Sequence, residues 1–375
     1  MKSIRLPAST ALFSLMLAGM TSTSTAAAGG QSLVPLGAFS AANSPVVSHP
    51  APSYRAGPGA TNPQTGNSWS SGSSMPATRA FLATATMGSR TYSIGGCESA
   101  YCKTVYATNQ AYNPATNRWT TSKPMPKARG TLVAAVGKNA SGIHQIYAIG
   151  GTAAPCCGGL QTNEAYNPST NSWTAAAPMP SGRFDLAAAT GSNGLIYTFG
   201  GNYGTTTVEA YNPVTNRWTC SVGDTGTGCT ARTITPMPEK SYIGAAAAVG
   251  DIIYVIVGFD AAVTGHAYAY NIKTNKWATL ASMPTPRCAL GAVAAKESNG
   301  AIGVYAIGGE NANFSAVNNN EVYTPSTKSW SAEAKLPAAE VSPGIATMSN
   351  GMIQVAGGGN DSVFDGTNAN QIYKP

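Results

Sequence analysis

Histidine and acidic side chains are scarce in this chain of 375 residues. The three histidines are His49, His144 and His266, and no set of cysteines and histidines has the spacing of a zinc site. So few imidazoles argue against a histidine-rich metal centre and against an ordinary Ser-His-Asp hydrolase. We therefore expect neither a metal nor a cofactor.

Charge and long hydrophobic runs are also in short supply. Charged residues make up only 10% of the chain, and the 22 basic side chains form no run, which disfavours a nucleic-acid partner. Beyond the N-terminus, no stretch has the roughly 20 apolar residues of a membrane helix. We therefore expect neither nucleic-acid binding nor membrane insertion.

The N-terminus has the order of a secretory signal peptide. Lys2 and Arg5 are basic, residues 11–20 are apolar, and small residues at 25–28 suit cleavage. The sequence thus predicts a signal peptide over residues 1–28, a flexible leader rich in Ala, Ser, Gly and Pro over 29–60, and a folded domain over 61–375. The mature protein is expected to be secreted or periplasmic, and the sequence does not separate these two compartments.

Seven cysteines agree with such an oxidising compartment. Six of them fall into three pairs that are close in sequence: Cys97 with Cys102, Cys220 with Cys229, and the adjacent Cys156 and Cys157. The first two pairs could each close a local loop by a disulfide. The adjacent pair forms either a strained vicinal bridge or bonds to other cysteines, and Cys288 is left over.

A short run of β-branched and aromatic residues that ends in glycine recurs six times. Such a run indicates a buried strand that stops where the backbone turns sharply. Four clear copies and two looser ones are residues 146–151, 304–309, 196–201 and 91–96, and residues 253–258 and 353–358.

All six tryptophans occupy one position of the same repeat, each a few residues after a tyrosine and a turn sequence. They are Trp69, Trp119, Trp173, Trp218, Trp277 and Trp330, spaced by 45 to 59 residues. A period near 50 residues with about four strands per unit is that of a propeller blade. The last repeat stops before its tryptophan strand, and residues 61–69 supply that strand. The sequence therefore predicts an all-β, six-bladed propeller whose last blade is closed by the N-terminal strand.

These residues resemble the kelch motif over residues 62–375. The shared features are two glycines after an apolar strand, a separated tyrosine and a following tryptophan, with departures at Val257, Leu336 and Gln354. The chain is similar to secreted bacterial-type kelch propellers of the galactose oxidase and kelch-like superfamily, and more distantly to N-acetylneuraminate epimerases. The copper site of the galactose-oxidase type needs histidines and tyrosines together, and this chain has no such set.

A ring of six residues stands four positions beyond each Met-Pro methionine or its leucine replacement: Arg79, Arg129, Arg183, Ser241, Arg287 and Glu340. Because the first strand of a blade lines the central channel, these side chains are expected to point towards the axis. Four arginines would form a positive pocket for carboxylates, phosphates or sugar oxygens. The alternative is that the arginines only bind backbone carbonyl groups between blades.

Neighbouring positions add further candidates for ligand contact: Tyr242, Asn202, Tyr203 and Asn311. Glu164, Glu209 and Glu321 each stand two residues before the repeat tyrosine. Because they recur at one repeat position, we expect them to make a structural hydrogen bond.

Two functions remain open. The first is a non-catalytic binding module that recognises a glycan or a protein on its arginine-lined face. The second, implied by the epimerase resemblance, is a periplasmic sugar epimerase or mutarotase that acts on an anionic sugar such as sialic acid. Glu340, Asp185 and Glu310 would then be the acid and base candidates, and a carboxylate beside arginine is expected to have a lowered pKa. The sequence favours binding over catalysis.

Overall fold

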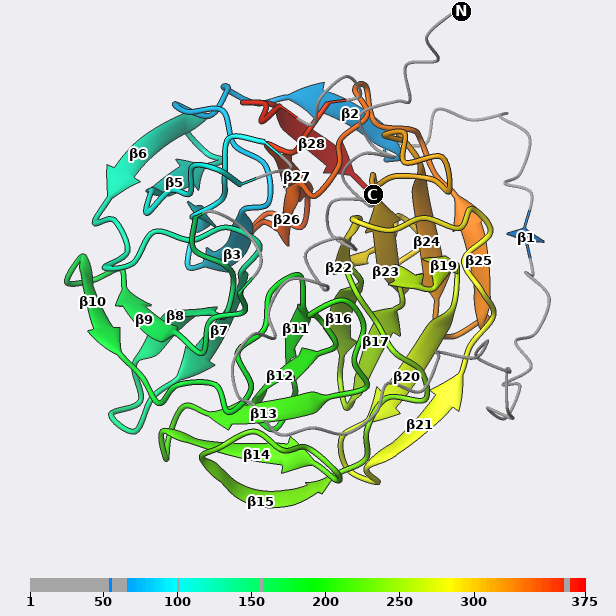
Figure 1. Cartoon of the computed structure of the whole chain (residues 1–375). Coiled ribbons are helices and arrows are strands. Elements are labelled where there is room, and N and C mark those ends of the chain that lie inside the picture. Colours follow the sequence, from blue (N-terminus) through cyan, green and yellow to red (C-terminus); the bar gives the residue numbers. More distant parts are fainter. Residues whose placement is uncertain (1–53, 56–65, 100–101, 155–157, 361–364) are drawn as a thin grey trace, which may run out of the picture.

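Six blades stand around a common axis (Figure 1). The computed structural model describes residues 54–55, 66–99, 102–154, 158–360 and 365–375. Within these residues the chain is all-β, and each blade is built on four antiparallel strands. The prediction of a six-bladed propeller is confirmed. None of the described residues belongs to a helix that is long and apolar enough to span a membrane. The predicted signal peptide and most of the predicted leader lie outside the described residues.

The blades follow one another along the chain, and the innermost strand of each blade comes first. Blades 1 to 3 comprise β3 (Ala83–Met87), β4 (Arg90–Ile94), β5 (Asn109–Asn113) and β6 (Arg118–Ser122); β7 (Val133–Lys138), β8 (His144–Ile149), β9 (Asn163–Asn167) and β10 (Ser172–Ala175); and β11 (Ala187–Thr190), β12 (Ile196–Phe199), β13 (Val208–Asn212) and β14 (Arg217–Ser221). Blades 4 to 6 comprise β16 (Ala245–Val249), β17 (Ile252–Ile256), β20 (Ala267–Asn271) and β21 (Lys276–Thr279); β22 (Gly291–Lys296), β23 (Ile302–Ile307), β24 (Asn320–Thr324) and β25 (Ser329–Ala332); and β26 (Gly344–Thr347), β27 (Ile353–Ala356), β28 (Asn370–Lys374) and β2 (Ser68–Ser71).

Blade 6 joins the two ends of the described chain. Strand β2 pairs antiparallel with β28, with Trp69 opposite Tyr373. The innermost strands of blades 1 and 6, β3 and β26, are also neighbours. The N-terminal strand therefore closes the ring as predicted, and no open edge is left between the first and last blades.

The repeated tryptophan holds each blade to the one before it. In every blade the indole packs on the repeat tyrosine, with ring centroids 4.9 to 5.5 Å apart. Each indole N–H donates a hydrogen bond of 2.7 to 3.1 Å to a backbone carbonyl oxygen that belongs to the preceding blade or its outgoing segment. The periodic Trp and Tyr of the sequence thus stabilise both the blade and the junction between blades.

Two blades carry a fifth strand that the repeat pattern did not predict. In blade 3, β15 (Cys229–Ile234) pairs parallel with β14, and in blade 5, β1 (Tyr54–Arg55) pairs parallel with β25. A short hairpin, β18 (Phe259–Asp260) and β19 (Ala262–Val263), follows the second strand of blade 4.

Two of the predicted local disulfides are present. Cys97 bonds to Cys102, and Cys220 bonds to Cys229, which ties β14 to the start of β15. Cys288 is free and buried. Cys156 and Cys157 lie outside the described residues.

Candidate functional site

A closed ring of six backbone hydrogen bonds surrounds the axis at one end of the channel. We call these residues the mouth ring, and each blade contributes one: Phe81, Thr131, Asp185, Ile243, Ala289 and Ser342. The N–H of each residue donates to the carbonyl oxygen of its neighbour in the preceding blade at 2.7 to 3.2 Å. All six have φ between +47° and +54°, which is uncommon for residues other than glycine. The ring therefore fixes the direction of six side chains at the channel entrance, and strained backbone of this kind is frequent at functional sites.

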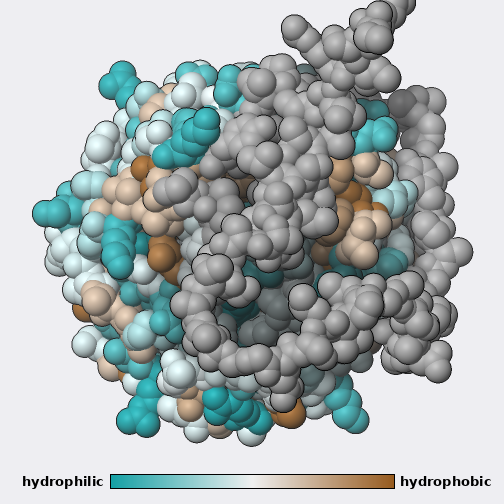
Figure 2. Space-filling view, in the orientation of Figure 1, coloured by the Kyte–Doolittle hydropathy of each residue, from teal (hydrophilic) through white to brown (hydrophobic). Residues whose placement is uncertain are grey.

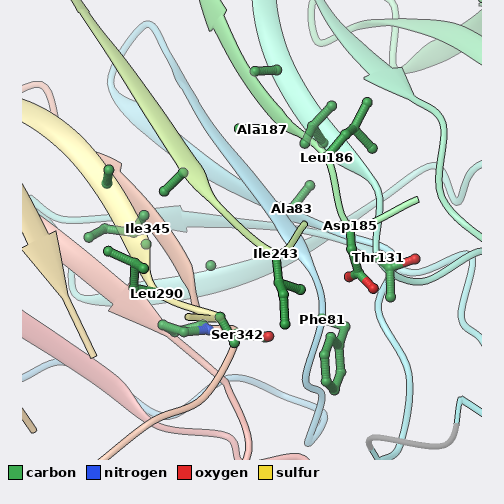
Figure 3. A pocket seen from close by; sticks show the side chains of 18 of the residues that line it. Phe81, Ala83, Thr131, Asp185, Leu186, Ala187, Ile243, Leu290, Ser342 and Ile345 are labelled. Atoms are coloured by element: carbon green, nitrogen blue, oxygen red, sulfur yellow. The ribbon is translucent and has the colours of Figure 1, made fainter. Parts of the chain in front are cut away.

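The mouth-ring residues line one end of a cavity in the channel (Figure 3). The cavity has a volume of about 170 Å³ and continues along the first residues of the six innermost strands. These residues are mostly alanine, glycine, leucine and valine, so the wall carries few polar side chains. Among the described residues, Asp185 is the only ionisable one that lines it.

The four predicted arginines do not line this cavity, and their side chains are 0 to 1% exposed. Each guanidinium group is bound within its own blade. Arg129 donates to Glu164 at 2.5 Å and to the carbonyl oxygen of Ala148 at 2.8 Å. Contact of the arginines with a ligand stays an untested prediction. Their burial agrees with a structural role, but the guanidinium groups bind carbonyl and side-chain oxygens of their own blade and not carbonyl groups between blades, as the alternative expected.

Two of the other three arginine blades repeat this ion pair. Arg183 contacts Glu209 at 2.5 Å, and Arg287 contacts Glu321. Arg79 instead donates to the amide oxygen of Gln110 at 2.6 Å, and burial lowers its pKa to about 10. The structural hydrogen bond predicted for Glu164, Glu209 and Glu321 is therefore confirmed, with the arginine of the same blade as its partner.

The backbone of the arginine position, rather than its side chain, joins neighbouring blades. The N–H of Gly96 donates to the carbonyl oxygen of Arg129 at 3.1 Å, and four other blade junctions repeat this contact. Gly95 and Gly96 have φ of +65° and +100°. A Cβ on Gly95 would lie 2.5 Å from the carbonyl oxygen of Arg129 in the next blade, and a Cβ on Gly96 would lie 2.7 Å from the carbonyl oxygen of Ala80 in the same blade. The glycine pair is thus needed for close approach of the blades.

Blades 4 and 6 depart from the arginine pattern. Ser241 is buried at the arginine position of blade 4, and Tyr268 stands where blades 2, 3 and 5 have glutamate. The acid at this place in the blade is the half-buried Glu239 instead, whose carboxylate accepts hydrogen bonds from His266 at 2.9 Å and from the Tyr268 hydroxyl.

In blade 6, Glu340 is 1% exposed and faces the Thr367 hydroxyl at 3.2 Å and the Gln371 amide at 3.4 Å. Burial raises the pKa of Glu340 to about 8. The expectation of a lowered pKa was wrong for this carboxyl, because the structure places no arginine beside it.

Blades 3 and 4 bring three of the predicted residues together beside the mouth ring. The Tyr242 hydroxyl donates to the carboxylate of Asp185, and burial raises the pKa of Asp185 to about 7. The Tyr203 ring lies 5.7 Å from that of Tyr242 and 5.2 Å from that of Phe184, the latter edge to face. This group presents one carboxyl and several aromatic surfaces at one side of the channel entrance.

Blade 5 adds a second buried acid to the same region. Glu310 is 7% exposed and accepts a hydrogen bond from the Cys288 thiol at 3.5 Å. Burial raises the pKa of Glu310 to about 7, and Glu310 in turn helps to raise that of Asp185. Two of the three predicted acid and base candidates therefore lie near one another, whereas Glu340 is enclosed in blade 6.

The two predicted asparagines have local structural roles. Asn202 donates to the carbonyl oxygen of Gly182 at 2.6 Å and accepts from the N–H of Phe184 at 3.2 Å. Asn311 accepts from the N–H groups of Asn313 and Ser315 in its own turn. Both side chains are half-buried, so ligand contact by either remains a prediction.

Among the described residues, one group of side chains has the proximity of a metal site: Cys220, Asp224 and Cys229. Both sulfurs belong to a disulfide, so neither can supply the thiolate that a metal would need. This group therefore does not fit a metal in the oxidised protein.

Comparisons with known proteins agree with the architecture. A profile described as the kelch motif matches residues 78–126, 144–180, 183–221 and 244–284. The chain is 25% identical over 274 residues to Kelch-like protein 25 of Xenopus tropicalis; the match covers 70% of this chain and 42% of that protein, so the chain spans less than half of that relative. A solved structure titled "Structure of YjhT" superposes with a TM-score of 0.57 at 15% identity, covering 79% of this chain and 95% of that one. The chain therefore carries kelch motifs, and its described residues fold as a six-bladed β-propeller.

Proposed function

We propose that the protein is an exported binding module that recognises a glycan or a protein on the propeller face where the mouth ring lies. The observation that carries this proposal is the concentration of departures from the repeat around one side of the mouth. Asp185, Tyr203 and Tyr242 have no counterparts of the same type in the other blades. A repeat scaffold needs uniform residues for its own stability, so polar and aromatic exceptions that meet beside a cavity point to recognition.

The composition of this side of the mouth suits binding. Aromatic side chains provide large contact areas at low conformational cost, and a rigid carboxylate provides directional hydrogen bonding. Where described residues are visible on this view of the molecule, the surface mixes hydrophilic and hydrophobic residues (Figure 2). A ligand that covers this rim could insert one chemical group into the channel entrance.

A sugar epimerase or mutarotase remains the second candidate, on one observation. Asp185 and Glu310 both have a pKa of about 7, which suits proton transfer near neutral pH. The anionic sugar of this alternative lacks support, because the guanidinium groups that would bind it are buried and engaged. Catalysis would thus depend on Asp185 and Glu310, and not on Glu340.

The test uses the mature protein, residues 29–375. It is applied to an array of neutral, acidic and amino-containing glycans at low and high salt, and each glycan that binds is then titrated by calorimetry. Tyr203→Ala is expected to weaken binding, whereas Val214→Ala, in the turn between β13 and β14 at the opposite face, is expected to leave it unchanged.

Three results would decide between the candidates. Binding that Tyr203→Ala weakens supports a recognition module. The enzyme hypothesis would replace the binding hypothesis if the protein turned over an anionic sugar, measured as anomerisation by NMR, and if Asp185→Asn abolished this turnover. If Val214→Ala weakened binding and Tyr203→Ala did not, the ligand would bind the opposite face and the proposal would be contradicted.

A further inference from the structure

We propose that the channel entrance is a subsite for a positively charged group, an ammonium or guanidinium, with Asp185 as its counter-ion. This inference rests on the proposed function and names the chemistry of the group that enters the mouth. The source of the cation would be either a lysine or arginine side chain of a protein or an amino sugar of a glycan.

The first support is that Asp185 is the one ionisable side chain among the described residues of the cavity wall. The other mouth-ring side chains are neutral: Phe81, Thr131, Ile243, Ala289 and Ser342. Figure 3 shows the Asp185 carboxylate at the entrance, close to Thr131 and on the same side as Phe81. A group that enters this cavity therefore meets one negative charge and otherwise neutral walls.

The second support is the rigidity of this carboxylate. The N–H of Asp185 donates to the carbonyl oxygen of Thr131 at 3.0 Å, and its own carbonyl oxygen accepts from Ile243 at 3.1 Å. With φ at +50° and the Tyr242 hydroxyl bound to its side chain, Asp185 has little freedom to turn away. A fixed carboxylate binds a cation without a further loss of conformational entropy.

The third support is the contrast with the buried glutamates of the blades. Glu164, Glu209 and Glu321 each form an ion pair with an arginine. Neither Asp185 nor Glu310 takes part in any of the five ion pairs found among the described residues. Partial burial of a carboxylate without a cation is costly, so a positively charged ligand would supply the missing partner.

The walls of the entrance also accept a cation better than an anion. Phe81 contributes an aromatic ring to the cavity, and a cation near such a ring gains attraction from its π electrons. An anion would face Asp185 and Glu310 with the arginines out of reach inside the blades. The entrance therefore selects positive over negative groups of similar size.

The experiment compares two pairs of small probes that differ in one positive charge. The first pair is Nα-acetyl-lysine amide and its Nε-acetylated form, and the second is glucosamine and N-acetylglucosamine. Each is titrated into the mature protein and followed by NMR, at pH 7.0, where most of the glucosamine amine is protonated. We expect the charged member of at least one pair to bind, its neutral counterpart to bind about tenfold more weakly, and Asp185→Asn to lose the difference.

Asp251→Asn is the matched control. Asp251 lies in the turn between β16 and β17, away from the mouth, and its carboxylate pairs with Lys273. This variant is expected to bind the charged probes as the wild type does. The lysine probe should also bind more weakly at pH 6 than at pH 8. Asp185, Glu310, Tyr203, Tyr242 and Cys288 are the titratable groups there, and only the two acids change charge in this range.

The possible results separate the sources and the hypotheses. Preference for the lysine probe points to a protein ligand, and preference for glucosamine points to a glycan. The inference is overturned if charged and neutral probes bind equally well. It is also overturned if Asp185→Asn binds the charged probes as tightly as the wild type does. No binding of either charged probe up to about 10 mM also overturns it. The proposed function would survive that last result if glycans still bind at Tyr203.

Discussion

The backbone N–H of Phe81 donates to the carbonyl oxygen of Ser342 at 3.2 Å, and this contact completes the mouth ring between the first and last blades. The two residues are far apart in the sequence and come together only when β2 closes blade 6. The site at the channel entrance is therefore a product of ring closure. Any change that opens the ring should disturb the mouth before it disturbs the individual blades.

Trp330→Phe is expected to weaken the junction between blades 4 and 5. Trp330 is 1% exposed, and its indole N–H donates to the carbonyl oxygen of Ala281 at 2.8 Å. Loss of that bond and of part of a buried ring should cost about 2 kcal/mol of unfolding free energy. Trp119→Phe, at a half-buried copy of the same position, should cost less, and an equal loss in urea unfolding would contradict the importance of burial at this junction.

Arg183→Met should destabilise the protein far more than Arg79→Met. Removal of Arg183 leaves the buried carboxylate of Glu209 without its cation, which costs about 3–5 kcal/mol. Removal of Arg79 leaves the neutral amide of Gln110, whose unsatisfied oxygen costs about 1–3 kcal/mol. Denaturant unfolding of the two variants measures the difference. If Arg183→Met were harmless to folding, the bracing role of these arginines would be wrong.

Unfolding temperature should fall as pH rises from 5 to 8. The folded-state pKa values of Asp185 and Glu310 are about 7 and that of Glu340 is about 8, all raised by burial above the usual value near 4. The native state therefore binds more protons than the unfolded state across this window, and stability is lost as pH rises through the folded pKa. Thermal scans at several pH values provide the measurement.

Glu340→Gln tests which carboxyl contributes to that pH dependence. The amide stays neutral at every pH, so the variant should gain stability over the wild type at pH 8 and gain little at pH 5. A wild-type unfolding temperature that does not change between pH 5 and pH 8 would contradict the raised pKa values.

Reduction of the Cys220–Cys229 disulfide should release β15 and leave the rest of blade 3 in place. Strand β15 is mostly exposed and pairs only with β14. A short loop of this kind contributes about 2–3 kcal/mol through the restriction of the unfolded chain. Hydrogen exchange in the double variant Cys220→Ser, Cys229→Ser should accelerate within residues 229–234. Acceleration spread equally over all blades would show that the bridge holds the whole ring.

Residues that recur at the blade period were predictable because the repeat states their role several times. Trp173 and Glu164 are examples, since each has equivalents at the same position of other blades. The partner of each arginine also had a signal in the sequence. Glutamate or glutamine accompanies arginine in its blade, and where Ser241 replaces arginine, Tyr268 replaces glutamate. That coupled change identifies the arginine as a structural partner of the same blade.

The mouth ring had no comparable signal. Phe81, Thr131 and Ile243 adopt positive φ, although aromatic and β-branched side chains do not favour that conformation. Hydrogen bonds from neighbouring blades impose it, and those blades are distant in sequence. The raised pKa of Glu340 escaped prediction for a similar reason, because the arginines that the sequence places beside it turn into their own blades.

The most direct test of the account is the affinity of the mature protein for the charged probe or glycan that binds it most tightly. This affinity is measured for the wild type, for Asp185→Asn and for Lys138→Ala. Lys138 is an exposed residue at the far end of β7, on the opposite face. The account predicts that Asp185→Asn weakens binding by about tenfold or more, and that Lys138→Ala changes it by less than about twofold. Full affinity in Asp185→Asn together with a loss in Lys138→Ala would place the binding surface on the other face and contradict the account.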